Sequence, residues 1–95
     1  MTETQLKNKI LRAIKQRWPD IWVRKISDMW HSGLPDLLMC VRGRFVAVEL
    51  KVSTNKATHL QEWELKCIRE AGGVGVICRS VDEVMQVLEE ICERR

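Results

Sequence analysis

Residues 33–51, GLPDLLMCVRGRFVAVELK, decide the fold of this chain. Two apolar runs flank a short turn, which predicts a two-residue hairpin loop because Gly43 can adopt the positive φ that such turns require. In the register that this loop sets, Asp36 stands directly opposite Glu49. Directly opposed residues share one face of a sheet, with their Cβ atoms roughly 4.5–5.5 Å apart.

Three polar side chains are predicted to gather on this face, because alternation along the strand places Lys51 on the same side as Glu49. Two carboxylates that face each other on an apolar sheet destabilise it unless something compensates their charge. A divalent cation is the obvious compensator, so Asp36, Glu49 and Lys51 predict a metal site with an ammonium group beside it. The alternatives are acids that lie in solvent at strand ends and a lysine that forms only a salt bridge.

The two runs themselves, LLMCV (37–41) and RFVAVEL (44–50), are almost continuously apolar. Such runs predict strands that are covered on both faces. Polar groups in these surroundings are costly unless they are paired or bound to metal, and this cost favours a functional reason for the acids.

Length and composition set the class of protein. A chain of 95 residues predicts a single domain over 1–95. Hydrophobic residues at 45% and charged residues at 31% are typical of an ordinary globular protein. No apolar run approaches the roughly 20 residues that span a bilayer, and the N-terminus lacks an apolar signal core. We therefore expect a cytoplasmic protein that does not contact membranes.

Four cysteines are widely spaced along the chain: Cys40, Cys67, Cys78 and Cys92. They form no C-x-x-C pair and have no nearby set of histidines, which argues against a zinc site. Each lies in a segment that reads as strand or helix, so we expect buried free thiols.

Charge is divided unevenly between the two halves of the chain. Residues 1–56 hold 11 lysines and arginines against 5 acids, whereas residues 57–95 hold 5 against 8. A basic half around a metal centre suits a polyanionic substrate such as nucleic acid. The cations that we expect to contact it are Lys7, Arg42, Arg44 and Lys56, although Lys7 can equally belong to a solvated helix face.

Hydrophobic periodicity predicts seven elements. In chain order they are a helix over 3–17, strands over 22–27, 35–41 and 44–51, a helix over 58–71, a strand over 74–78, and a final helix after a capping box at Ser80 and Glu83. The order α-β-β-β-α-β-α predicts a small α/β sandwich with a mixed central sheet, in which the helix over 58–71 connects two parallel strands by a right-handed crossover.

Three short motifs in this order resemble the PD-(D/E)XK nuclease superfamily: Ser-Gly-Leu-Pro-Asp at 32–36, Glu-Leu-Lys at 49–51 and Gln-Glu-Trp at 61–63. More closely, they resemble its virus-type replication-repair nuclease branch, VRR-NUC, in the short stand-alone form found in phages. The resemblance covers nearly the whole chain, and the element order agrees with that restriction-endonuclease-like fold. It implies a metal-dependent phosphodiesterase.

The resemblance also implies a role for each motif residue. Asp36 and Glu49 would bind Mg²⁺ or Mn²⁺ together with the backbone carbonyl of Leu50. Lys51 would position the attacking water or stabilise the charge that develops on the phosphate. Gln61 would assist from the second predicted helix.

Three further residues have competing interpretations. Gln61 completes a capping-box pattern with Thr58, so its amide can simply cap its own helix. Glu3 is the candidate for the acid that the family carries in its first helix, but an acid there also suits the helix dipole. Ser32 can contact a phosphate or shape the turn with Gly33.

These observations predict a Mg²⁺- or Mn²⁺-dependent DNA endonuclease, selective for branched or four-way-junction DNA by analogy with the family. We expect a homodimer and no nucleotide cofactor, and a location in the host cytoplasm if a phage encodes the chain. One alternative is a catalytically silent module for nucleic-acid binding or assembly. Another is an RNA endonuclease on the same scaffold.

Overall fold

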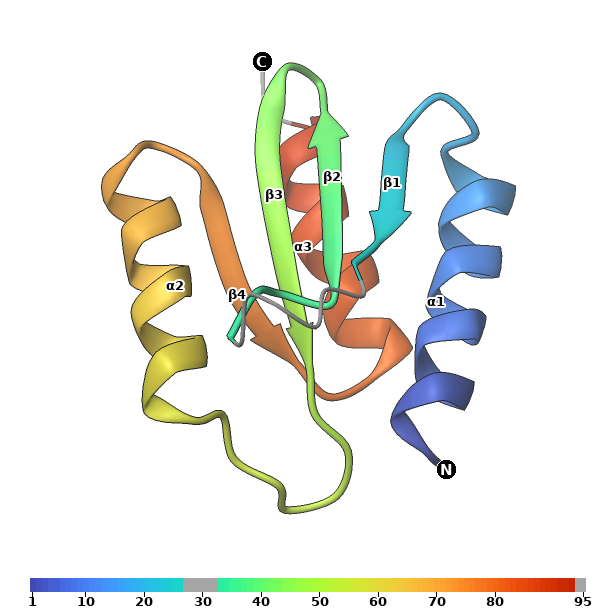
Figure 1. Cartoon of the computed structure of the whole chain (residues 1–95). Coiled ribbons are helices and arrows are strands. Elements are labelled where there is room, and N and C mark those ends of the chain that lie inside the picture. The colour runs from blue at the N-terminus through green and yellow to red at the C-terminus, as the bar shows by residue number, and fades with distance from the viewer. Residues whose placement is uncertain (27–32, 94–95) are drawn as a thin grey trace.

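The computed structural model describes residues 1–26 and 33–93. A four-stranded sheet lies at its centre with three helices around it (Figure 1). The elements are α1 (Glu3–Arg17), β1 (Trp22–Lys25), β2 (Leu37–Val41), β3 (Arg44–Leu50), α2 (His59–Glu70), β4 (Val74–Cys78) and α3 (Val81–Glu93). Their order confirms the predicted α-β-β-β-α-β-α arrangement. β1 ends at Lys25, and residue 27 of the strand predicted over 22–27 lies outside the described residues.

The β2–β3 hairpin has the predicted register. Its antiparallel ladder runs from Val41 opposite Arg44 at the turn to Leu37 opposite Val48 at the far end. Arg42 adopts φ 50° beside Gly43 at φ 80°. Positive φ at both central residues identifies the type I′ turn, whose twist matches that of the flanking strands.

The sheet is mixed, as predicted. The strands lie in the order β1-β2-β3-β4, with β1 and β2 antiparallel and β3 and β4 parallel. α2 connects the two parallel strands. α1 and α3 lie against one face of the sheet and α2 against the other (Figure 1).

The core fills the space between the sheet and the pair α1 and α3. Alternate residues of β2 and β3 point into it and are fully buried, together with one stripe from each helix: Leu37, Met39, Val41, Val46, Val48, Leu50, Ile10, Ile14, Val84 and Leu88. Among the described residues, no helix combines the length and apolar composition that crossing a membrane requires.

The helix caps are present in the predicted places. Thr2 caps α1, and the Ser80 hydroxyl accepts a hydrogen bond from the Glu83 N–H at 3.1 Å. The Glu83 carboxylate accepts from the N–H of Arg79 instead of that of Ser80, so the last capping box forms only in part.

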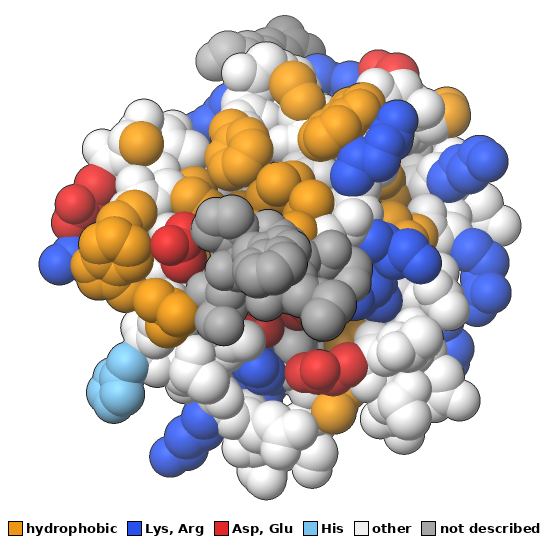
Figure 2. All heavy atoms as spheres, viewed as in Figure 1, with side chains coloured by type: hydrophobic (Ala, Val, Ile, Leu, Met, Phe, Trp, Pro, Cys, Tyr) orange, Lys and Arg blue, Asp and Glu red, His pale blue; other side chains and the backbone are white. Residues whose placement is uncertain are grey.

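The opposite face of the sheet differs from the prediction. The expectation that both strands are covered on both faces is wrong for β2 and for the start of β3, where Phe45 is exposed. α2 packs against β3 and β4, and apolar side chains lie open on the rest of this face (Figure 2). A 12-residue helix is about 18 Å long and about 10 Å wide, so it covers roughly two strands. Cys40 of β2 is therefore exposed, whereas Cys78 is buried as expected, and all four cysteines are free thiols.

Close approach of α2 to β4 depends on Gly75. A Cβ atom at this position would lie 2.8 Å from the Leu65 carbonyl oxygen, and this obstacle is backbone that cannot rotate away. We expect Gly75→Ala to lower the free energy of unfolding by about 1–3 kcal/mol, the usual cost of overpacking. Urea unfolding measures the change, and Ile77→Val, at a partly exposed position of the same strand, is the control. Equal stability of Gly75→Ala and wild type would contradict this packing.

Candidate functional site

Asp36 lies against the end of β3, one step beyond the last β2–β3 pair and so opposite Glu49 in the same register. Its Oδ2 atom accepts a hydrogen bond from the Leu50 N–H at 2.8 Å. In an extended strand the N–H and C=O of one residue point to the same side, so the Leu50 carbonyl also faces the Asp36 end of the hairpin. The local backbone thus brings two carboxylates and one carbonyl to the same end of the sheet.

Glu49 is almost fully buried, with 3% of its surface exposed. Its Oε2 atom lies 3.3 Å from the Lys51 ammonium. Its Oε1 atom is buried and has no hydrogen-bond partner among the described residues. A buried oxygen without a partner is costly and calls for a specific explanation, of which a bound ion is one.

The surroundings of Glu49 disfavour its charged form. Burial, followed by the negative charge of Asp36, raises the pKa of Glu49 from 4.5 to about 7. Lys51 acts in the opposite direction but does not offset these effects. A cation placed at the free oxygen would reverse the balance and favour the carboxylate.

A second lysine completes the cluster. The Lys7 ammonium, from the second turn of α1, lies 3.6 Å from Asp36 Oδ1. Both side chains are mostly buried, with 20% and 24% exposed. Each carboxylate of the pair thus has its own lysine within 4 Å. Local sequence patterns did not reveal this contact, because it depends on how α1 docks on the sheet.

The donor atoms fit a hard divalent cation. Mg²⁺ takes oxygen ligands, keeps several waters and is usually held by only one or two carboxylates. Asp36 and Glu49 supply two carboxylates, and the Leu50 carbonyl adds a third oxygen ligand. Within residues 1–26 and 33–93, no group of three or more His, Cys, Asp or Glu side chains is arranged to hold a metal. A role of Glu3 in the site stays a prediction.

Gln61 forms the capping box that the sequence left open as its alternative role. Its Oε1 atom accepts from the Thr58 N–H at 2.9 Å, and its own N–H donates to the Thr58 hydroxyl at 3.1 Å. The loop that leads into Asp36 nevertheless packs on this turn of α2, because Gly33, at φ 90°, leaves room for Leu60 where a Cβ would lie 2.6 Å from its side chain. A direct role of Gln61 in the site stays a prediction.

The other predicted site residues lie further out. Glu3 is half-buried at the start of α1, one turn before Lys7. Ser32 falls outside the described residues. Arg42 sits at the hairpin turn, at the opposite end of β2 from Asp36, and forms an exposed ion pair with Asp20 at 2.8 Å.

Two more cations were predicted to contact nucleic acid. Arg44 is half-buried at the start of β3, and Lys56 is exposed in the loop after β3. The structure does not test whether either residue contacts nucleic acid, so both contacts stay predictions.

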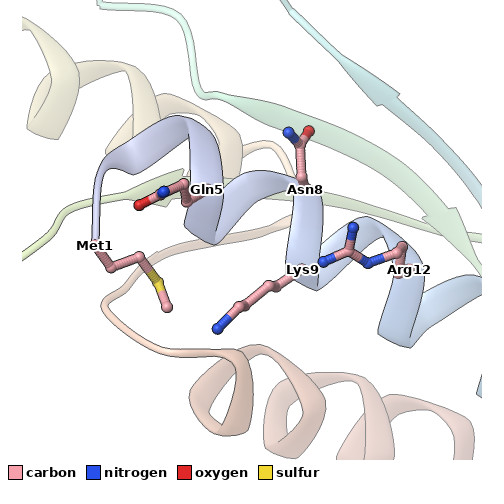
Figure 3. Close-up of a pocket in the computed structure, with 5 residues that line it drawn as sticks. All are labelled: Met1, Gln5, Asn8, Lys9 and Arg12. Atoms are coloured by element: carbon pink, nitrogen blue, oxygen red, sulfur yellow. The ribbon is translucent and has the colours of Figure 1, made fainter.

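A separate hollow of about 350 Å³ lies beside α1 (Figure 3). It is lined by Met1, Gln5, Asn8, Lys9 and Arg12. Figure 3 shows Met1 and Lys9 projecting from the same side of the helix. None of the four charged groups of the cluster lines this hollow, so it is distinct from the candidate site.

Two solved structures resemble this chain over most of its length. One, named "VRR_NUC domain", is 29% identical, has a TM-score of 0.68, and is matched over 86% of this chain and 92% of that chain. Another, named "VRR_NUC domain protein", is 18% identical with a TM-score of 0.82 over 96% of this chain and 88% of that chain, and it supports the fold alone. The chain matches no protein-family profile and no curated protein.

The small α/β fold with its four-stranded mixed sheet agrees with these likenesses. These likenesses support the resemblance of the chain to the nuclease domains named VRR-NUC.

Proposed function

We propose that this protein is a metal-dependent endonuclease that hydrolyses phosphodiester bonds of DNA. The observation that carries the proposal is the opposed pair Asp36 and Glu49, in which one buried carboxylate oxygen of Glu49 has no partner among the described residues. Burial of a carboxylate oxygen without a partner destabilises the fold. Two acids in this arrangement, beside two lysines, suit a site that binds a divalent cation and a phosphate.

Each group would have a distinct part in the chemistry. Asp36, Glu49 and the Leu50 carbonyl would hold Mg²⁺ or Mn²⁺, which supplies charge neutralisation and a water of lowered pKa when bound. Lys51, with its ammonium 3.3 Å from Glu49, would stabilise the charge that develops on the phosphate. Lys7, freed from Asp36, would contact the same phosphate or the next one along the strand.

Selectivity for branched DNA and a homodimeric state are part of the proposal. The basic residues concentrate in the half of the chain that holds the site. Two-fold dimers are the commonest oligomers, and two equivalent sites would suit paired cuts in a four-way junction. An RNA endonuclease and a silent binding module are the alternatives that the first experiment separates.

Cleavage of labelled substrates tests the proposal directly. A four-way DNA junction, a linear duplex, a single strand and matched RNAs are each incubated with Mg²⁺, Mn²⁺ or EDTA. We expect cuts in the junction with either metal and none in EDTA, and a loss of at least about 100-fold in Glu49→Gln, as for other groups that stabilise the transition state. Glu62→Gln, an exposed acid of α2, is the matched control and should cleave normally.

Several outcomes would contradict it. Cleavage in EDTA, or by the Glu49→Gln variant, would contradict the proposed metal site. Cutting of every DNA substrate would contradict the proposed preference for junctions. Cutting of RNA alone would favour the RNA endonuclease. Tight binding without any cut would favour the silent module.

The pKa of Glu49 predicts how stability varies with pH in the metal-free protein. Below pH 4.5 the group is protonated in both the folded and unfolded chains, so burial of its charge costs nothing. Between pH 4.5 and about 7 the unfolded chain releases the proton first, so this group lowers the free energy of unfolding as pH rises. Above pH 7 the full cost, about 3 kcal/mol, is present.

Glu49→Gln removes this charge and keeps the shape of the side chain. In EDTA the variant should therefore be more stable than wild type above pH 7, and the difference should shrink as pH falls toward 4.5. Urea unfolding of both proteins across this range measures the difference. A difference that is constant with pH, or that grows in acid, would contradict the buried acid.

Lys7 and a metal ion would compete for Asp36. An ion pair of this partly exposed kind contributes about 1 kcal/mol, which corresponds to roughly fivefold in binding. We therefore expect Lys7→Gln to bind Mn²⁺ on the order of fivefold more tightly in calorimetry, and Lys9→Gln, an exposed lysine of the same helix, to leave the affinity unchanged. Weaker binding by Lys7→Gln alone would show that Lys7 supports the site instead.

A further inference from the structure

The open half of the sheet carries a row of exposed side chains. Trp22 of β1 pairs with Cys40 of β2, and Cys40 pairs with Phe45 of β3, so the three share one face. Trp22 is 47% exposed and Phe45 is 46% exposed, and Cys40 is exposed as well. In Figure 2 apolar side chains gather on this face of the sheet. We call these three residues the aromatic row.

The aromatic row and the acids lie on the same face. Asp36 precedes Cys40 by four residues and Glu49 follows Phe45 by four, and side chains two or four positions apart in a strand point the same way. The row is therefore about 13 Å from the carboxylates along the strands. A strand of nucleic acid that reaches the acids across this face would cross the row.

An arginine lies between the aromatic row and the acids. Arg24 pairs with Leu38. Leu38 lies two residues from Asp36 and two from Cys40, so Arg24 lies between the acids and the aromatic row on this face. Its guanidinium lies 4.9 Å from the centre of the Trp22 ring, and its Nη1 donates to the Val23 carbonyl at 2.8 Å. The cation is thus held over the ring, where it can contact a phosphate while a base stacks nearby.

An apolar hollow lies next to the Phe45 end of the aromatic row, between β3 and α2. It has a volume of about 330 Å³ and is lined by Phe45 together with Cys67, Ile68, Ala71 and Gly73. No side chain in it carries a charge. The hollow offers apolar surface beside the Phe45 ring, as a flat base requires.

We propose that the aromatic row is a stacking platform for unpaired nucleotides of the substrate. Exposed aromatic side chains on a sheet face bind bases whose flat surfaces are free, whereas bases in a duplex are already stacked on each other. The preference is therefore for strands that are single or splayed next to the cleaved bond, as at a branch point. This proposal rests on the nuclease function above and names the part of the substrate that the site would bind.

A second copy of this chain is the competing occupant of the aromatic row. Burial of the row in a dimer would cover the face on which the acids lie about 13 Å away. That arrangement would restrict access of a polyanion to the candidate site. The exposed arginine at the row also suits a phosphate backbone.

Binding without cleavage tests the platform. Fluorescence anisotropy in EDTA compares a labelled single strand, a splayed fork and a blunt duplex of the same sequence. We expect Trp22→Ala to weaken binding of the single strand and the fork by about 5- to 100-fold, the usual effect of losing one base–aromatic stack, and to change duplex binding by less than about twofold. Phe45→Ala should act in the same direction, and Trp22→Phe should retain most of the affinity.

Trp63→Ala is the matched control, because Trp63 is 58% exposed but lies on α2. Equal losses in Trp22→Ala and Trp63→Ala, or an equal loss for duplex and single strand, would overturn the platform. Dissociation of a dimer by Trp22→Ala, measured by light scattering, would also overturn the platform if the loss of affinity disappears at protein concentrations that restore the dimer. Metal-dependent cleavage by wild type is scored separately, so a failed platform and a failed nuclease give different results.

Discussion

The register of the β2–β3 hairpin is the constraint on which the rest of the structure depends. The type I′ turn at Arg42 and Gly43 fixes Val41 opposite Arg44, and every later pair follows from it. Because side chains alternate, a slip of one residue would move the buried set to the outer face and carry the acids into the core. One turn therefore decides both where the core lies and that Asp36 and Glu49 meet on the opposite side of the sheet.

The carboxylate pair is maintained against its own electrostatics. Burial and the neighbouring Asp36 raise the pKa of Glu49, and one of its oxygens has no partner among the described residues. Stability alone would be served better by an apolar pair at these positions, because both strands are otherwise apolar. Lys7 and Lys51 limit the cost without removing it. A local violation of the folding rules, placed at the end of a well-packed hairpin, is what a functional site is expected to look like.

Sequence patterns predicted most of the fold because its determinants are local. Periodicity located both ends of α1 and α2 to within about one residue, and the hairpin loop gave the pairing of Asp36 with Glu49. The contact of Lys7 with Asp36 could not be predicted, because it depends on how α1 docks over strands far away in the chain. The exposure of Cys40 was missed for a related reason. α2 is too narrow to cover β2, and the apolar residues around Cys40 do not indicate which strands a helix will cover. That open surface is also where the aromatic row lies.

We propose above all that Asp36 and Glu49 form one binding site for a divalent cation. Anomalous diffraction from crystals soaked in Mn²⁺ tests it most directly, with Glu49→Gln crystals treated in the same way. The account predicts a manganese peak within about 2.2 Å of a carboxylate oxygen of each acid and near the Leu50 carbonyl, and no peak there in the variant. A peak elsewhere, or none in wild-type crystals at saturating Mn²⁺, would contradict it.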